Sequence, residues 1–337
     1  MNTVEQNAGG QMRPVSVIGT GSYVPDRILT NADLEKIVDT TDEWILTRSG
    51  IRERRIARAD QATSDLAAEA GRQALEAAGV APEEVDQIIV GTITQDMGFP
   101  STACFVQDLL KARNAHCFDL AAACSGFVYA LETGRQFVAS GSVRTSLVIG
   151  AEKLSGVTDW TDRTTCVLFG DGAGAVVLRS VEGRRGILGT VMGSDGALAD
   201  LLGIPGGGSR HPASVQTVEG RLHFMKMNGK EVFKHAVRTM SDATLQVLEK
   251  CHLSFDDIQM VIPHQANIRI IQAIGDRLGL PAEKVFVNVE KYGNMSSATV
   301  PVALDQAIRS GRVKRGDRVV LVAFGGGFTW GATVLEL

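Results

Sequence analysis

Long apolar runs, a dominant charge of one sign and a secretion signal are all missing from this sequence. No apolar run approaches the length of a membrane-spanning helix, so we expect no membrane anchor. The formal net charge is −4, which gives no reason to expect a nucleic acid as partner. The first dozen residues are polar and lack a basic stretch followed by an apolar core. We interpret residues 1–12 as a flexible N-terminal tail and expect a cytoplasmic protein.

Cysteine is scarce and irregularly placed. The five cysteines are an odd number, and none has the Cys-x-x-Cys spacing. A disulfide framework or a zinc site is therefore not expected, and a reducing compartment is the default. By contrast, 44% of the 337 residues are hydrophobic, which is enough to build a large buried core. The composition indicates one large globular domain or two of ordinary size.

Short β-rich runs alternate with alanine-rich helical stretches along the chain. Such alternation predicts an α/β fold with mainly parallel sheets. Helices are expected over residues 63–79, 124–140 and 243–251. The expected strands are 14–21, 85–92, 145–152, 175–180, 258–264, 318–324 and 332–337.

Three blocks of the N-terminal part reappear in the same order in the C-terminal part. The aligned pairs are 74–90 with 247–263, 136–141 with 306–311, and 169–178 with 324–335. The offset is 173 residues for the first pair, 170 for the second and 155 at the start of the third. This order indicates a duplicated fold with different insertions in each copy. We expect an N-terminal half at 13–182 and a C-terminal half at 183–337.

The second aligned pair, 136–141 with 306–311, has an offset of 170 residues. When the same offset is applied to the residues before this pair, Cys124 aligns with Asn294. Pseudo-twofold symmetry would bring two equivalent positions together where the halves meet. An interface of that kind is a common place for a shared site. The sequence therefore predicts that Cys124 and Asn294 occupy equivalent positions in the two halves.

Cys124 stands among small residues in the segment DLAAACSGFVYAL. Small neighbours leave room for a substrate, and the helix expected after Cys124 would lower the pKa of its thiol. The backbone N–H of Cys124, with one from residues 325–327, could hold a developing oxyanion. An inert buried thiol is the commoner role of a free cysteine. We expect that role for the other cysteines: Cys104, Cys117, Cys166 and Cys251.

His264 and Asn294 stand in two further polar motifs. His264 follows an apolar run that ends at Pro263 and precedes a helix expected from about Ala266, so it lies at a strand end. Asn294 alone would most often be a turn or cap residue. A lone histidine is usually structural, which is our interpretation of His116, His211, His223, His235 and His252.

Five motifs together resemble a known family. AAACSGF, PHQAN, YGNMSSA, FGDGAGAVVL and AFGGGFTWG closely resemble those of β-ketoacyl-acyl-carrier-protein synthase III, the initiating condensing enzyme of type II fatty-acid synthesis. The resemblance runs from about residue 14 to the C-terminus, and residues 40–55 and 159–165 also fit it. It implies a thiolase-like α/β fold with duplicated halves in five αβαβα layers. It also implies a homodimer.

The resemblance implies a two-stage reaction. Cys124 would attack a short acyl-CoA, with acetyl-CoA as the expected donor, and release CoA. Malonyl-acyl-carrier protein would then lose carbon dioxide, while His264 and Asn294 donate hydrogen bonds to the enolate oxygen. The carbanion would attack the acyl group, whose oxygen is held by the backbone N–H groups of Cys124 and Gly326. The product would be 3-oxoacyl-acyl-carrier protein, and no metal or redox cofactor is expected.

The resemblance also implies binding residues. Those expected to bind CoA are Trp44, Arg48, Arg163 and Asn267, with Trp44 and Arg163 on the two faces of the adenine. Those expected to line the acyl pocket are Phe99, Leu154, Phe169 and Phe324, with Phe99 reaching across a dimer interface. These four residues could equally be ordinary core. Trp44 could be a core aromatic, but its setting in TDEWILTR is polar and suits a surface platform. The glycine-rich segment 203–212 is expected beside the pocket, as a mobile segment or as a surface loop.

A basic stripe is expected to receive the acidic acyl carrier protein. Lys230, Lys234 and Arg238 recur every four residues on one helix face, and Arg269 follows the PHQAN motif. The charge pairing would mainly steer the encounter. A solvated charged face is the alternative interpretation of this spacing.

Other functions fit parts of the pattern. A stand-alone ketosynthase or acyltransferase of secondary metabolism would use the same three residues on another acyl donor. Degradative thiolases and elongating synthases carry a second cysteine or a second histidine where Asn294 stands, so both are disfavoured. A papain-like cysteine hydrolase would predict a single-copy fold, which the internal repeat contradicts. A non-catalytic scaffold would have no reason to keep all three polar residues.

Overall fold

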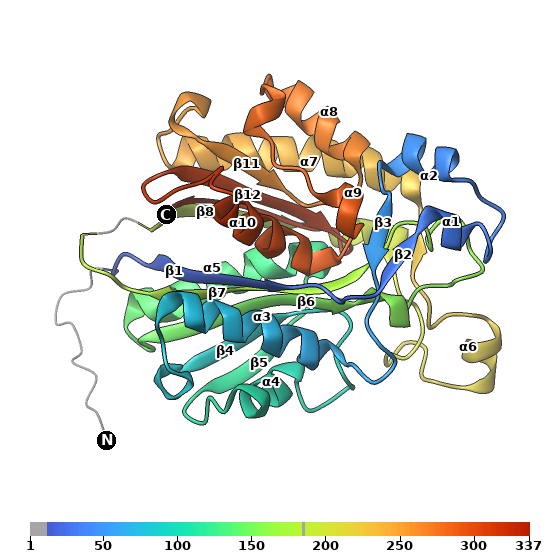
Figure 1. Cartoon of the computed structure of the whole chain (residues 1–337), viewed down its shortest axis with the longest axis horizontal. Helices are drawn as coiled ribbons and strands as arrows, with labels where there is room; N and C mark the ends of the chain where they lie inside the picture. Colours follow the sequence, from blue (N-terminus) through green and yellow to red (C-terminus); the bar gives the residue numbers. More distant parts are fainter. Residues whose placement is uncertain (1–11, 184–185) are drawn as a thin grey trace.

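Two mixed sheets lie at the centre of the fold (Figure 1). The computed structural model describes residues 12–183 and 186–337. The first sheet has the strand order β1-β7-β6-β4-β5. Its strands are β1 (Ser16–Tyr23), β4 (Gln87–Gly91), β5 (His116–Leu120), β6 (Thr145–Lys153) and β7 (Asp171–Arg179). The second sheet has the order β11-β12-β13-β8. Its strands are β8 (Ile187–Ser194), β11 (Met260–Pro263), β12 (Arg318–Gly325) and β13 (Thr329–Glu336).

Helices cover both sheets and fill the space between them. α3 (Thr63–Ala78) and α4 (Thr102–Leu110) lie on the outer face of the first sheet. α7 (Gly229–Lys250) and α8 (Ile268–Leu278) cover the outer face of the second. α5 (Gly126–Ser140) and α10 (Thr299–Arg309) lie between the sheets, and the core side chains there come from both halves. The expected thiolase-like α/β fold with five αβαβα layers is confirmed (Figure 1).

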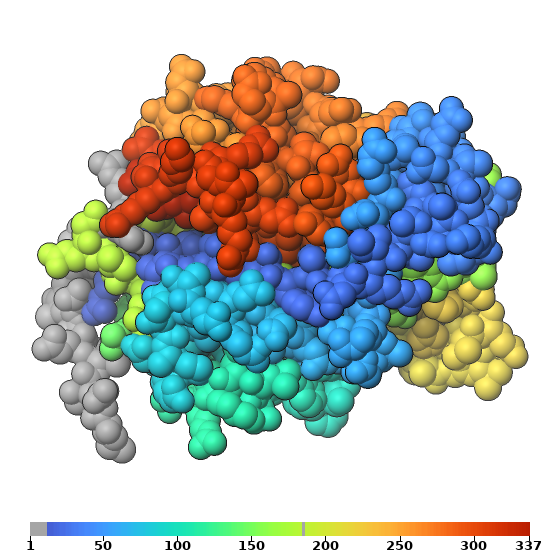
Figure 2. Space-filling model, in the orientation of Figure 1, coloured from blue at the N-terminus to red at the C-terminus, as the bar shows by residue number. Residues whose placement is uncertain are grey.

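Shorter elements decorate this frame. β2 (Ile28–Thr30) pairs with β3 (Glu53–Arg55), and β9 (Leu202–Gly203) pairs with β10 (Lys226–Met227). The remaining α-helices of the described chain are α1 (Asn31–Leu34), α2 (Asp42–Ser49), α6 (Val215–Glu219) and α9 (Val289–Tyr292). The segment around α6 forms a separate lobe at the edge of the molecule (Figure 2). Within residues 12–183 and 186–337, no helix is long and apolar enough to cross a membrane.

The expectation of mainly parallel sheets is wrong. β4 is parallel to β5 and β6, and β11 is parallel to β12. However, β6 and β12 are each followed by an antiparallel neighbour, β7 and β13, and the edge strands β1 and β8 are also antiparallel. The connections from β6 to β7 and from β12 to β13 contain no crossover helix, so the chain returns beside the strand it has just left. Because helices cover both faces of these strands, the strands are continuous apolar runs whether they are parallel or antiparallel. The sequence pattern therefore does not distinguish the two directions.

The duplication is visible in the elements, and it corrects one alignment. β4 begins at Gln87 and its counterpart β11 at Met260, while α5 begins at Gly126 and its counterpart α10 at Thr299. Both pairs are 173 residues apart, which is also the offset between the aligned blocks 74–90 and 247–263. The offset shrinks only towards the end of these helices, because α10 has 11 residues and α5 has 15. Cys124 is therefore equivalent to Ser297, and the pairing of Cys124 with Asn294 is wrong.

Two short turns carry these equivalent residues to the interface between the halves. The 3-10 turns η2 (Ala123–Ser125) and η7 (Ser296–Ala298) pack against each other. Ala123 has a φ of 46° and Ser296 a φ of 45°, a left-handed conformation that both non-glycine residues adopt at matching positions. The first sheet is built from residues before 180 and the second from residues after 186. The half boundary at 182 and 183 stays a prediction. The expected tail, 1–12, lies outside the described residues except for Met12.

Candidate active site

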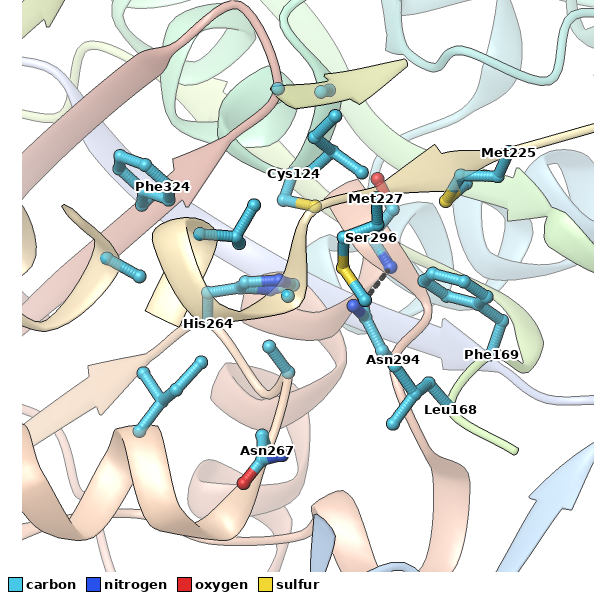
Figure 3. A pocket seen from close by; sticks show the side chains of 18 of the residues that line it. Cys124, Leu168, Phe169, Met225, Met227, His264, Asn267, Asn294, Ser296 and Phe324 are labelled. Carbon is cyan, nitrogen blue, oxygen red and sulfur yellow. Dashed lines mark hydrogen bonds between the residues drawn. The ribbon is translucent and has the colours of Figure 1, made fainter. Parts of the chain in front are cut away.

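A cavity of about 900 Å³ opens where the two halves meet. Cys124, His264 and Asn294 all line it, and Figure 3 shows their side chains converging on one space. Cys124 comes from η2, His264 follows β11, and Asn294 follows α9. The three residues are nearly buried, at 8%, 3% and 8% exposed respectively. The three polar motifs of the sequence therefore meet at one place, although each comes from a different segment.

The Cys124 backbone, in η2, lies against the end of β12. A Cβ atom added to Gly325 would lie 2.5 Å from the Cys124 backbone nitrogen, so only glycine fits at that point of the strand. Burial raises the pKa of the Cys124 thiol to about 12, and the nearby Glu152 adds to this effect while the Ser296 hydroxyl opposes it. The expectation that the helix start lowers this pKa is wrong. Removing the sulfur from water outweighs the lowering by the Ser296 hydroxyl and by the Cys124 backbone N–H.

His264 is neutral and tied to the interface helix. Its Nδ1 atom lies 2.6 Å from the Thr299 Oγ1 atom, and its backbone N–H donates to the Val322 carbonyl at 2.8 Å. Burial lowers the pKa of His264 to about 3. Its ring is therefore uncharged near pH 7, with one nitrogen as a donor and the other as an acceptor. A neutral ring with so low a pKa is suited to donate a hydrogen bond to an oxyanion. It is poorly suited to act as a general base.

The Asn294 amide is oriented by the backbone around it. Its Oδ1 atom accepts a hydrogen bond from the Ser296 N–H at 2.8 Å (Figure 3). Its backbone N–H donates to the Leu168 carbonyl at 2.8 Å. The preceding Gly293 has a φ of 63°, and a Cβ atom there would lie 2.7 Å from the Leu168 oxygen. With Oδ1 engaged, the Nδ2 donor of Asn294 is left for a ligand.

Trp44, Arg48 and Asn267 lie at the cavity. The Arg48 guanidinium carbon is 4.7 Å from the Trp44 ring centroid, and that of Arg163 is 5.6 Å from it. Asn267 caps α8 through its Oδ1 atom, and its Nδ2 atom donates to the Arg48 carbonyl at 2.8 Å. Asn267 therefore joins α8 to α2, the helix that carries Trp44. Trp44, Arg48 and Arg163 form a cluster, and the expected binding of the CoA adenine there stays a prediction.

The structure separates the four residues expected at the acyl pocket. Phe169 and Phe324 line the cavity. Leu154 is fully buried behind the wall, where it packs with Phe169 and Met225. Phe99 is 86% exposed and is not among the cavity-lining residues of the described chain. Its expected reach across a dimer interface stays a prediction.

Several cavity-lining residues were missed by the sequence analysis. Leu202, Ile204, Met225 and Met227 come from β9, β10 and the loops next to them, which have no repeat, motif or periodic pattern. Ile93 comes from the loop after β4. Gly203 and Ile204 also line the cavity, so the glycine-rich segment 203–212 does begin beside it. Further missed apolar residues lie on α7 and α8: Val232, Phe233, Met240 and Ile270.

The expected basic stripe is exposed. Lys230, Lys234 and Arg238 lie on α7 with exposed side chains, and Arg269 is exposed on α8. Lys230 and Arg269 also line the cavity, so the basic surface extends from its opening along α7. Arg238 faces Asp242 at 3.7 Å, which leaves the two lysines as the less compensated charges.

Comparison with known proteins gives a consistent answer. Residues 118–196 match the family model for 3-oxoacyl-[acyl-carrier-protein (ACP)] synthase III, and residues 248–337 match the model for its C-terminal part. A β-ketoacyl-[acyl-carrier-protein] synthase III of Caldanaerobacter subterraneus is 57% identical over 320 residues, which is 95% of this chain and 97% of that protein.

Two solved structures are similar over almost the whole chain. The 3-oxoacyl-[acyl-carrier-protein] synthase III of Aquifex aeolicus has a TM-score of 0.89 and 50% identity, with 96% of this chain and 100% of that chain covered. The priming β-ketosynthase of the R1128 polyketide pathway has a TM-score of 0.90 and 38% identity, with 98% of each chain covered. The fold, the converging motifs and these similarities agree: the chain belongs to the β-ketoacyl-[acyl-carrier-protein] synthase III family.

Proposed function

We propose that the chain catalyses the decarboxylative condensation of a short acyl-CoA with malonyl-acyl-carrier protein. The product is 3-oxoacyl-acyl-carrier protein, and the reaction initiates type II fatty-acid synthesis through an acyl group on Cys124. The observation that carries this proposal is the convergence of Cys124, His264 and Asn294 in one cavity between the halves. Membership of the synthase III family supports the choice of reaction.

Acyl transfer is the first stage. The Cys124 sulfur forms a bond to the thioester carbon, the bond from that carbon to the CoA sulfur breaks, and CoA leaves. The carbonyl oxygen becomes an oxyanion on the way, and the backbone N–H groups of Cys124 and Gly326 are the proposed donors to it. Gly325 supports this assignment because it presses β12 directly against the Cys124 backbone.

Decarboxylation and condensation form the second stage. Loss of carbon dioxide leaves an enolate whose oxygen needs donors, and Asn294 Nδ2 and His264 are the proposed pair. The lowered pKa of His264 keeps its ring neutral, so it acts as a donor through Nε2–H. The carbanion then forms a bond to the acyl carbon, and the bond to Cys124 breaks. The residues of this chain supply each role without a metal or redox cofactor, which we propose is not required.

The binding partners follow from the surface. Trp44, with Arg48 and Arg163 near its ring, is the proposed adenine and phosphate site of CoA. Lys230, Lys234, Arg238 and Arg269 form the proposed landing area for the acidic carrier protein. The exposed Phe99 supports a homodimer in which this side chain is covered by the partner. A cytoplasmic location is also a proposal.

Incubation with a panel of acyl-CoA esters and malonyl-carrier protein tests this function. Mass spectrometry should find the acyl group on Cys124, followed by release of carbon dioxide and a 3-oxoacyl product. A folded sample that forms no acyl-enzyme with any CoA ester would exclude the proposal. A stand-alone ketosynthase of secondary metabolism is not favoured, because curated relatives at 54–57% identity are named β-ketoacyl-[acyl-carrier-protein] synthase III.

A further inference from the structure

Glu152 is a buried carboxyl group beside the candidate active site. It lies near the end of β6, and its side chain is 0% exposed. Its oxygens accept hydrogen bonds from Thr94 Oγ1 at 2.6 Å, Thr92 Oγ1 at 3.1 Å and the Ile93 N–H at 3.2 Å. Each of these partners is neutral. A buried carboxylate compensated only by neutral donors binds a proton more readily than an exposed one.

Ser296 belongs to η7, which packs against both β6, the strand of Glu152, and η2, the turn of Cys124. The Ser296 side chain lies beside the Cys124 sulfur on the cavity wall (Figure 3). Contact with the Ser296 hydroxyl lowers the pKa of Cys124 and also that of Glu152, so this hydroxyl neighbours both groups. The Oγ atom is buried and has no well-formed hydrogen bond within the described chain. A buried hydroxyl without a hydrogen-bond partner, near both a thiol and a carboxyl, can pass a proton from one to the other.

Glu152 is also the stronger base of the two titratable groups near the thiol. Burial raises the pKa of Glu152 to about 7, whereas burial lowers the pKa of His264 to about 3. Other charged groups on the surrounding elements have partners of their own: Lys153 binds the Arg58 and Gln61 carbonyls, Asp171 binds Ser155, and Asp96 binds Ser64.

We infer that Glu152 accepts the proton of Cys124, with the Ser296 hydroxyl as the relay. This inference rests on the proposed function. In acyl transfer, the Sγ–H proton moves to Ser296 Oγ while the Ser296 proton moves to Glu152. The thiolate bonds to the acyl carbon, and CoA leaves as a thiolate that solvent protonates. In condensation, the bond between Sγ and the acyl carbon breaks, and the thiolate takes back the proton from Glu152. Carbon dioxide leaves without a proton, so the second stage needs no proton source other than Glu152.

Alkylation of Cys124 by iodoacetamide between pH 5.5 and 9.5 tests the relay without any acyl substrate. In the unmodified protein, the rate should rise through about pH 7, where Glu152 becomes an acceptor. In Glu152→Gln this rise should disappear, and the rate at pH 8 should fall roughly 100-fold, the scale of a lost general base. If Glu152 acts only through its charge, its removal makes the thiolate easier to form and the rate increases. An unchanged or faster rate would overturn the inference.

Two further variants keep the test decisive. Ser296→Ala leaves the carboxyl in place and should lose the same rise near pH 7. If it alkylates like the unmodified protein, the relay is wrong. Asp171→Asn is the matched control, because Asp171 is also a buried carboxyl that accepts from a hydroxyl and a backbone N–H. Its profile should be unchanged. Failure here is distinguishable from failure of the proposed function, which the acyl-CoA panel measures separately.

Discussion

The Thr299 hydroxyl lies 2.6 Å from His264 Nδ1 and 2.9 Å from the Ser296 carbonyl oxygen. A hydroxyl carries one hydrogen, so it donates to one of these atoms at a time. When it donates to Nδ1, the neutral ring carries its proton on Nε2. That tautomer is the one that the proposed decarboxylation requires.

Replacing Thr299 should therefore separate the two stages. In Thr299→Val, decarboxylation of malonyl-carrier protein should fall about five- to tenfold, which corresponds to one hydrogen bond of about 1 kcal/mol. Acylation of Cys124 should be unchanged, and Thr299→Ser should restore decarboxylation. Carbon dioxide release and protein mass measure the two stages. Equal losses in Val and Ser variants would contradict a role for the hydroxyl.

Removing His264 should have a larger effect on the same stage. His264→Ala should still form the acyl-enzyme but lose roughly 100- to 1000-fold in decarboxylation, as for a lost oxyanion donor. The check is radiolabelled carbon dioxide release alongside intact-protein mass. Normal decarboxylation by this variant would refute the assignment of His264 as a donor.

The buried His264 also predicts a pH dependence of stability. Its pKa is about 3 in the folded protein, against 6.5 for an ordinary histidine. The unfolded chain therefore binds more protons between these values, and stability is lost as the pH falls from about 6.5 towards 3. His264→Gln should flatten the dependence of unfolding free energy on pH by up to about 1.4 kcal/mol per pH unit in this window. Urea titrations at pH 4, 5 and 6 measure it, and an identical slope in both proteins would contradict it.

Gly325→Ala should displace η2, the turn that carries Cys124. The added Cβ atom would lie 2.5 Å from the Cys124 nitrogen, so the turn or the strand must move. We expect a loss of about 1–3 kcal/mol in stability and a larger loss of acylation rate than of CoA affinity. Gly196→Ala is the control, because a Cβ atom there meets nothing within 4 Å. Unchanged acylation in the Gly325 variant would show that the contact is dispensable.

Trp44→Ala should weaken binding of CoA substrates specifically. Loss of the ring should raise the KM for acetyl-CoA about tenfold, the equivalent of about 1–2 kcal/mol of stacking. The KM for acetyl-pantetheine, which has no adenine, should not change. Steady-state kinetics with both donors makes the comparison. An equal rise for both would place Trp44 outside the adenine site.

The sequence predicted the frame of the fold better than its details. Each expected strand overlaps an observed one, because buried apolar runs bounded by turn residues are a strong signal. In the two central sheets, β5 and β8 were not predicted, since His116–Leu120 is short and Ile187–Ser194 is interrupted by polar and glycine residues. The helix expected at 243–251 proved to be the end of α7, whose first half is rich in charged side chains.

The site was predictable where motifs carry it and not where packing does. Cys124, His264 and Asn294 could be chosen because each stands in its own polar motif, although their roles stay predictions. The raised pKa of Cys124 could not be foreseen, because it depends on burial by segments far apart in the sequence. Glu152 was missed for the same reason. Within a strand run such as TSLVIGAEK, nothing distinguishes a surface glutamate from one enclosed by η7 and the loop after β4.

The equivalence of Cys124 and Ser297 shows how the duplicated halves diverged. The Ser297 hydroxyl donates to the Gly91 carbonyl at 2.7 Å, at the end of β4, so it fastens one half to the other. One copy of the turn thus carries the proposed nucleophile, and the other copy carries a hydroxyl that holds the two halves together. The hydrogen bond of Ser297 therefore fixes η7, which is the turn that packs against the turn of Cys124.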